Sequence, residues 1–593
     1  MKLVWRSLSL IVFLILIACD EQTEKNEQTF KTTFENSGGT ETATYQEVID
    51  FYLNLAKEYP EIHVQNIGAT DSGKPLHLVT YNPDGNFNFK KLQEDKTILL
   101  INNGIHPGES DGIDASMMLF RDLANNKIPT PKNTILTTIP VYNVGGMLNR
   151  NSTSRANQNG PKAYGFRGNA RNFDLNRDFI KMDTKNAATF ATIFHMVKPD
   201  VFVDNHVSNG ADYQYTLTHL FTQHNKLGGA AGDFLHSTLM PQLEQKLAVH
   251  KWDITPYVNV FNKPPETGFS QFLDNPRYST GYTTLWNTLG LMVETHMLKP
   301  YKQRVEGTYE LMKQLVVLTE EHHKKIKNLR KEAQQTALTL EKYPLRWELD
   351  STQVTTLNFK GYKADTIASA ITGFNRLKYN RDSTFTKQVP YYNYYKGTEE
   401  VEVPAAYLIK KSWSTVLERL SQNGISYQTI AKDTVLEVEA YKIASYETYS
   451  NAYEGHYPHY DTRVTKSSKS IALEKGDVLV KTNQLGVRYV LEVLEPTAVD
   501  SFFNWNFFDT ILQQKEGFSP YVFEDTALEI LENNSILKDS LMAKKQREPS
   551  FANNWYAQLD YIFNHSQLYE RAHLSYPIYR VTKGKYNLEG LIQ

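Results

Sequence analysis

The chain has 593 residues, of which 40% are hydrophobic and 12% aromatic, which is enough for two or three globular domains. Its 64 basic and 66 acidic residues leave a formal charge of −2, and no basic stripe runs along the chain, so no nucleic-acid partner is expected. The single cysteine, Cys19, excludes both a disulfide framework and a zinc–thiolate site.

Residues 1–19 have the composition of a lipoprotein signal peptide. Lys2 and Arg6 precede an apolar run, 8–17, that is too short for a transmembrane span. The run ends in Leu-Ile-Ala-Cys, which resembles the bacterial lipobox, where the cysteine is lipidated and becomes the mature N-terminus. An ordinary signal peptide with an incidental cysteine is the alternative. We therefore expect an extracytoplasmic protein, anchored to a bacterial membrane through a lipid on Cys19.

The rest of the chain divides into three parts by composition. Residues 20–42 are polar and predict a flexible tether. Residues 43–338 alternate apolar strands with helices, which predicts an α/β domain whose mixed, mostly parallel sheet is flanked by helices. The expected strands are 62–70, 76–82, 97–104, 134–143, 200–208 and 289–296; the expected helices are 45–60, 111–126, 187–198 and one long closing helix, 303–338.

Residues 339–593 are rich in β-branched and aromatic side chains. They predict a β-rich α+β accessory region of one or two domains, with a strand–helix–strand unit over 405–443. No catalytic constellation stands out there, and the sequence does not indicate its role.

Residues able to bind a metal follow several of the expected strands. His106 and Glu109 stand in "HPGE" directly after strand 97–104, while His206 and Glu294 end two other strands. A lone H-x-x-E is a weak signal, but polar residues at the carboxyl ends of parallel strands lie where such sheets place their sites. A further motif, Asp-Leu-Asn-Arg, begins at Asp174.

The order H-x-x-E, D-x-N-R, strand-terminal His and strand-terminal Glu resembles the zinc metallocarboxypeptidase family, whose archetype is carboxypeptidase A. The resemblance covers roughly residues 45–335. It implies that His106, Glu109 and His206 bind one zinc ion per chain. It also implies that Asp174 orients His106 through the free ring nitrogen.

The remaining implied residues act on the substrate. Asn176 and Arg177 would grip the terminal carboxylate of a peptide, and Glu294 would be the general base that activates a zinc-bound water. Arg167 is expected to stabilise the oxyanion, with Arg155 as the second candidate.

A tyrosine that closes over the substrate is also expected. Tyr282 is the first choice and Tyr278 the alternative. Gly108 stands where many members carry an arginine, so one substrate contact is missing and the side-chain preference stays open.

The resemblance implies a zinc-dependent carboxypeptidase that hydrolyses C-terminal peptide bonds of extracytoplasmic peptides with a free carboxylate. Two alternatives remain. One is a zinc amidase or deacylase on a carboxylate-bearing substrate such as a muropeptide or acyl-amino acid. The other is a non-catalytic lipoprotein that binds peptides or glycans.

Overall fold

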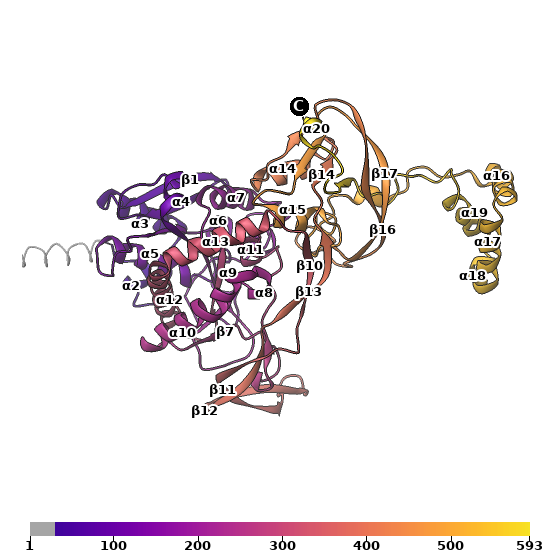
Figure 1. The fold of residues 1–593 in the computed structure, drawn as a ribbon. Coiled ribbons are helices and arrows are strands. Elements are labelled where there is room, and N and C mark those ends of the chain that lie inside the picture. The colour runs from indigo at the N-terminus through magenta and orange to yellow at the C-terminus, as the bar shows by residue number, and fades with distance from the viewer. Residues whose placement is uncertain (1–29, 593) are drawn as a thin grey trace, which may run out of the picture.

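The computed structural model describes residues 30–592 (Figure 1). The expected signal peptide, the lipidation of Cys19 and the first part of the expected tether lie outside the described residues. Within 30–592, no helix combines the length and the apolar character that a membrane crossing requires.

An eight-stranded sheet forms the centre of the first domain, in the order β1-β2-β4-β3-β5-β9-β6-β7. Four of its seven pairings are parallel: β3–β4, β3–β5, β5–β9 and β6–β7. These pairings confirm the prediction of a mixed, mostly parallel sheet. The apolar strands β3, β4 and β5 are buried on both faces, as is usual for parallel strands covered by helices on each side. The strands are β1 (Ile62–Ala69), β2 (Pro75–Tyr81), β3 (Thr97–Asn102), β4 (Thr134–Ile139), β5 (Val201–Ser208), β6 (Leu217–Phe221), β7 (Ile254–Pro256) and β9 (Leu289–His296).

Helices cover both faces of this sheet, and alternate residues of β5 show which helix lies on which face. Phe202 packs on Phe190 of α7, whereas Asn205 contacts Met312 of α12. The helices are α3 (Tyr45–Glu58), α4 (Phe89–Asp95), α5 (Asp111–Ala124), α6 (Val144–Leu148), α7 (Lys185–Val197), α8 (His224–Leu227), α9 (Gly229–Phe234), α10 (Met240–Val249), α11 (Ser279–Thr284), α12 (Tyr301–Glu321) and α13 (His323–Ala337).

The prediction of one long closing helix is wrong. The chain leaves helical geometry at His322 (φ −104°, ψ 11°), so that α12 and α13 are separate helices. The ring of His322 is bound to the side chain of Gln242, and His323 is bound to the backbone carbonyl of Glu320. These two histidines are half-buried at the break between α12 and α13. The charged residues around them continue the helical pattern, so the break was not predicted from the sequence.

Residues 30–42, expected to be tether, pack on the first domain instead. Phe30 and Phe34 are buried in its core, and Phe34 belongs to a short capped helix, α2 (Thr33–Asn36), that precedes α3. Glu35 forms an ion pair of 2.7 Å with Arg121 of α5. The buried Phe30 and Phe34 and this ion pair hold the polar stretch against the first domain.

The accessory region does not separate cleanly from the first domain. Its hairpin, β11 (Thr355–Ala368) with β12 (Asn375–Tyr392), joins β8 (Phe269–Ser270) of the first domain in one small sheet. A six-stranded sheet follows, in the order β15-β18-β14-β19-β16-β17. The other elements are β10 (Lys342–Leu349), β13 (Tyr395–Glu402), β14 (Ala406–Ile409), α14 (Ser414–Gln422), β15 (Gln428–Thr429), β16 (Thr434–Thr448), β17 (His459–Leu473), β18 (Val478–Lys481), α15 (Val487–Leu494), β19 (Ile578–Val581) and α20 (Glu589–Ile592).

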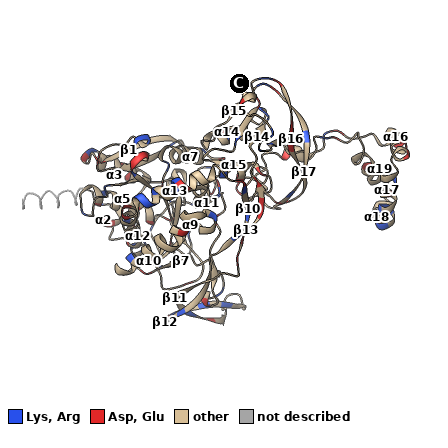
Figure 2. Ribbon diagram, viewed as in Figure 1, with Lys and Arg blue, Asp and Glu red and all other residues tan. Residues whose placement is uncertain are grey.

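Four helices with a small core of their own stand away from the rest of the molecule at the end of a long connection (Figure 1). These helices were not predicted from the sequence. Basic and acidic residues are interspersed in both the first domain and the accessory region (Figure 2). The four helices are α16 (Pro520–Asn533), α17 (Ser535–Arg547), α18 (Pro549–Ala552) and α19 (Trp555–Asn564).

Candidate active site

Three side chains able to bind a metal meet at the carboxyl ends of β3 and β5. His106 and Glu109 lie in the turn after β3, where the Glu109 amide donates to the His106 carbonyl at 2.8 Å. His206 is the sixth residue of β5. One ligand atom from each of the three lies within 4.8 Å of the others, and each residue is at most 4% exposed.

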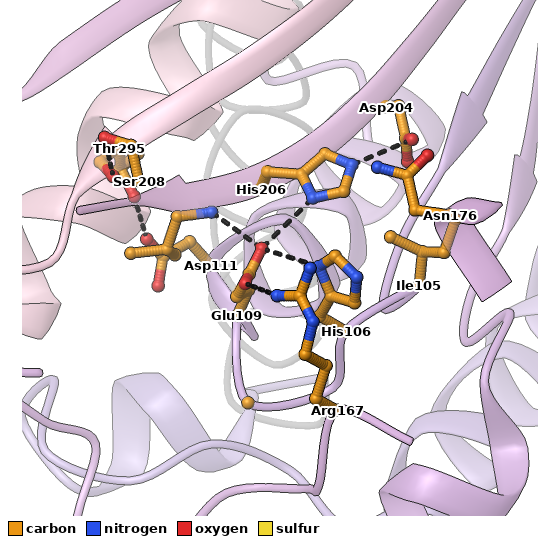
Figure 3. Close-up of polar contacts among 12 residues, drawn as sticks. Ile105, His106, Glu109, Asp111, Arg167, Asn176, Asp204, His206, Ser208 and Thr295 are labelled. Carbon is orange, nitrogen blue, oxygen red and sulfur yellow. Dashed lines mark hydrogen bonds and ion pairs between the residues drawn. The ribbon is translucent and has the colours of Figure 1, made fainter. Parts of the chain in front are cut away.

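Both imidazoles present the same nitrogen to this cluster. The Nδ1 atoms of His106 and His206 lie 3.2 and 3.1 Å from Oε2 of Glu109 (Figure 3). Their Nε2 atoms are each bound at 2.9 Å by a carboxylate, Asp174 for His106 and Asp204 for His206. Such carboxylates fix the ring and leave the opposite nitrogen for a metal. The buried Nδ1 of His106 makes no hydrogen bond to the described residues. Two imidazoles and one carboxylate therefore fit zinc.

Asp204 was not predicted from the sequence. It also accepts hydrogen bonds from Asn102 at 2.9 Å and from the Ser279 hydroxyl at 2.5 Å, so it is held on three sides. The available signal was the spacing Asp-x-His within a strand, which places both side chains on one face.

Two arginines surround the carboxylate of Glu109. Arg155 Nη1 lies 3.0 Å and Arg167 Nη1 3.6 Å from its Oε1. Burial alone would raise the pKa of Glu109, but His106 and Arg155 outweigh it and hold this pKa well below the usual range. Arg167 also binds Asp174 at 2.8 Å, so it links a candidate metal ligand to the carboxylate that orients another.

Glu294 stands beside His206 as its register partner across β5 and β9. Its side chain is half-buried, and the buried Oε2 atom has no hydrogen-bond partner among the described residues. Burial raises its pKa to about 8; His206 opposes the rise, and the charges of Glu109 and Asp204 add to it. A carboxyl with a raised pKa and a free oxygen has the properties of a general acid–base.

A cavity of about 610 Å³ opens over these residues. It brings together all three candidate ligands, Glu294, both candidate arginines, Asn176 and Arg177. Asp174 stands behind His106, outside the lining. The other lining residues are Ser154, Ala156, Asn157, Val207, Ser208, Asn209, Leu220, Tyr257, Asn259, Phe261, Phe272, Tyr278, Met292 and Met297.

The expectation for Tyr282 is wrong. This side chain is 1% exposed, and its hydroxyl donates to Asn423 at 2.7 Å and contacts His195 at 3.1 Å, away from the cavity. It points from α11 into an aromatic core that includes Phe194 of α7. Tyr278, the alternative, precedes α11 and lines the cavity.

Asn176, Arg177 and Tyr278 form one polar corner of the cavity. The Arg177 guanidinium lies 4.6 Å from the centre of the Tyr278 ring. The side-chain oxygen of Asn176 accepts from the Ser279 amide at 3.1 Å, which leaves the amide NH₂ for another partner. The two residues are thus placed to bind a carboxylate.

Gly108 lies directly against Arg155. A Cβ atom on Gly108 would stand 2.6 Å from Cδ of Arg155 and 2.9 Å from the carbonyl oxygen of Gly165. The missing side chain therefore makes room for an arginine from elsewhere in the chain to reach Glu109.

The chain is similar in sequence to proteins named as carboxypeptidases. No family model matches the chain. Over 100 residues it is 37% identical to "Carboxypeptidase 2" of Trichophyton rubrum, a segment that covers 17% of this chain and 18% of that protein. It is 23% identical over 501 residues to "Carboxypeptidase 2" of Trichophyton equinum, covering 79% of this chain and 84% of that protein.

The solved structures to which the chain is similar include a metallo-carboxypeptidase and a carboxypeptidase A. The metallo-carboxypeptidase from Burkholderia cenocepacia matches with a TM-score of 0.34 and 15% identity over 47% of this chain and 70% of that one. Carboxypeptidase A from Helicoverpa armigera matches with a TM-score of 0.36 and 14% identity over 52% of this chain and 82% of that one. The curated relatives carry the carboxypeptidase name, so the resemblance to that family is confirmed.

Proposed function

We propose that this protein is a zinc-dependent metallocarboxypeptidase that removes C-terminal residues from peptides. One observation carries the proposal: a metal-ligand cluster, a carboxyl with a raised pKa and a carboxylate-binding pair open into the same cavity. Asn176 and Arg177 favour a substrate with a free carboxylate.

The residues divide the work of hydrolysis. Zinc held by His106, Glu109 and His206 would polarise the scissile carbonyl and acidify a water. Glu294 takes a proton from the attacking water and returns it to the amine as the C–N bond breaks. The guanidinium groups of Arg155 and Arg167 stabilise the charge that develops on the carbonyl oxygen.

The wall next to Glu294 indicates the preferred side chain. Met292 lies two residues before Glu294 on β9, on the same face, and pairs with Leu220 of β6. Phe272 and Tyr257 also line the cavity. Burying an unpaired charge against such a wall is costly, so the substrate has an apolar or aromatic C-terminal residue.

The proposed location follows from the first residues of the sequence. A lipid on Cys19 would hold the enzyme at a bacterial membrane, outside the cytoplasm, where its substrates would be extracytoplasmic peptides. Metabolic labelling with a fatty-acid probe, compared between the natural sequence and Cys19→Ala, tests this.

The catalytic proposal is tested with one variant and two substrates. We expect the purified protein to hold one zinc per chain and to trim a peptide ending in free phenylalanine, but not the same peptide with an amidated C-terminus. Glu294→Gln should keep the zinc and lose roughly 100-fold or more of the activity.

Absence of zinc would contradict the metal site, and unchanged activity in Glu294→Gln would contradict the role of Glu294. Cleavage of acyl-amino acids or muropeptides without peptide trimming would favour the amidase alternative.

A further inference from the structure

The polar corner of the cavity is supported from behind by the accessory region. Every residue that lines the cavity lies between 106 and 297. Yet the backbone amide of Asp174, which begins the D-L-N-R motif, donates a 2.7 Å hydrogen bond to Glu454, 280 residues further on. The segment that carries Asn176 and Arg177 therefore depends on a residue outside the first domain.

Glu454 sits at the tip of a tight turn, here called the brace turn (Tyr453, Glu454, Gly455, His456). Tyr453 and His456 exchange backbone hydrogen bonds of 2.8 and 3.1 Å. The two central residues have positive φ, 50° at Glu454 and 80° at Gly455, as in a type I′ turn. Positive φ is unfavourable for a glutamate, so the fold holds this side chain in place against a local preference.

The second central residue brings the brace turn against the chain just before Asp174. A Cβ atom on Gly455 would lie 3.0 Å from the Phe173 ring. Glycine is thus required at this position both by its φ and by the closeness of the aromatic ring. The contact fixes how near Glu454 approaches the Asp174 amide.

Ionic contacts anchor the turn at its other end. His456 binds Asp183 at 2.7 Å, and Asp183 accepts from Lys181 at 2.8 Å. Lys181 is fully buried and lies 4.5 Å from the centre of the Phe173 ring. Lys181 also pairs with the buried Asp178 at 2.8 Å, so losing either carboxylate would leave a buried charge less well compensated.

The accessory region holds the tyrosine side of the corner in the same way. Arg277, directly before Tyr278, pairs with Asp500 at 2.8 Å through its side chain, and its amide donates to the same carboxylate at 2.9 Å. Its guanidinium lies 5.1 Å from Trp505, whose ring in turn stacks on Tyr453 of the brace turn. Both walls of the corner thus rest on one cluster of accessory residues.

From these contacts we infer that Glu454 is a positioning residue, through which the accessory region sets the carboxylate-binding geometry of Asn176 and Arg177. The inference rests on the proposed function for its catalytic meaning. Glu454 touches no substrate; it fixes the Asp174 amide, and the D-L-N-R segment follows. The accessory region is then a working part of the enzyme.

Glu454→Ala and Glu454→Gln, made in the full chain, separate positioning from stability. Alanine removes the acceptor for the Asp174 amide, while glutamine keeps an acceptor oxygen. We expect Glu454→Ala to raise KM for a peptide ending in free phenylalanine about tenfold, with a much smaller fall in kcat. A tenfold change corresponds to the loss of roughly one hydrogen bond to a charged group. Glu454→Gln should restore most of the loss, and Gly455→Ala should reproduce it.

Hydrogen exchange of residues 173–178 provides a readout that needs no activity. Their amides should exchange faster in Glu454→Ala and Gly455→Ala than in the natural protein. Glu447→Ala, an exposed glutamate on β16 of the same hairpin, is the matched control and should change neither exchange nor KM.

Unchanged exchange in both brace-turn variants would overturn the inference, as would faster exchange with an unchanged KM. The dissociation constant of the same peptide is also compared between Glu294→Gln and the double variant Glu294→Gln/Glu454→Ala. Because neither variant turns the peptide over, this comparison measures affinity alone. If the natural protein neither binds nor trims the peptide, the proposed function fails, while the exchange data still decide whether the brace exists.

Discussion

His206 and Glu294 are register partners on adjacent parallel strands, β5 and β9. Residues paired in this way put their side chains on the same face of the sheet, so a candidate metal ligand and the candidate base are placed by backbone hydrogen bonds. Asp204 pairs in the same manner with Met292, two residues earlier. The register of the sheet thus places the candidate ligand His206 beside the candidate base Glu294. It also places Asp204 beside Met292, which lines the cavity.

Asp204 supports His206, and its removal should weaken the metal site. In Asp204→Asn the amide still contacts the imidazole but no longer carries the charge that makes it a better ligand. We expect zinc affinity, measured by competition with a chromophoric chelator, to fall about 10- to 100-fold. Activity should return as zinc is added. Asp253→Asn, an exposed aspartate paired with Lys360, is the control; equal affinity in the two variants would contradict the role of Asp204.

Most of the candidate site could be predicted because its residues follow apolar strands in a recognisable order. His106, His206 and Glu294 end β3, β5 and β9 or follow them directly, so hydrophobic pattern and chemistry agreed. Tyr282 was misplaced because Tyr278 and Tyr282 are four residues apart and only packing decides which one faces the cavity. No local signal could have linked Glu454 to Asp174, since 280 residues separate them.

The predictions at the two ends of the first domain, the tether and the single closing helix, were wrong for a different reason. The order of residues 30–42 depends on two aromatic side chains reaching the core of another segment, which composition does not report. The break at His322 depends on its contact with Gln242 of α10. In both cases a tertiary contact outweighed the structure that the local sequence favours.

The cavity wall predicts a preference among peptides that differ only in their last residue. With Leu220, Met292 and Phe272 in the lining, we expect kcat/KM for C-terminal phenylalanine or leucine to exceed that for lysine or aspartate by about 100-fold or more. Mass spectrometry of a mixed peptide set gives the ranking directly. Met292→Ala shortens a side chain of this wall and enlarges the cavity, so it should shift the preference toward larger aromatic residues. Rapid release of lysine by the natural protein would contradict this assignment of the wall.

Gly108 should be intolerant of even one methyl group. A Cβ atom in Gly108→Ala would collide with Arg155 and with the Gly165 carbonyl, moving the guanidinium away from Glu109. We expect kcat/KM to fall about tenfold while zinc content stays the same. Gly517→Ala, where a Cβ atom would meet nothing within 4 Å, is the matched control.

A double-variant comparison shows whether Arg155 carries that effect. If it does, Gly108→Ala should cost much less activity in an Arg155→Ala background than in the natural protein. Equal losses in both backgrounds would assign the effect to the Gly165 backbone instead.

Stability of the accessory region should depend on pH through Glu492 of α15. Burial raises the pKa of this side chain from 4.5 to about 7; Lys226 and the hydrogen bond from Tyr343 oppose the rise. Because the folded state holds the proton more tightly than the unfolded state does, the stabilisation is fully present below pH 4.5. It is lost as the pH rises toward 7, by about 3 kcal/mol.

The variant Glu492→Gln tests this, because its side chain stays neutral and can still accept from Tyr343. As the pH rises through this window, its free energy of unfolding should increase relative to that of the natural protein. Urea unfolding at several pH values between 4 and 8 measures the difference, with the exposed Glu529→Gln of α16 as the control. Parallel profiles for the natural protein and Glu492→Gln would show that Glu492 is ionised equally in both states.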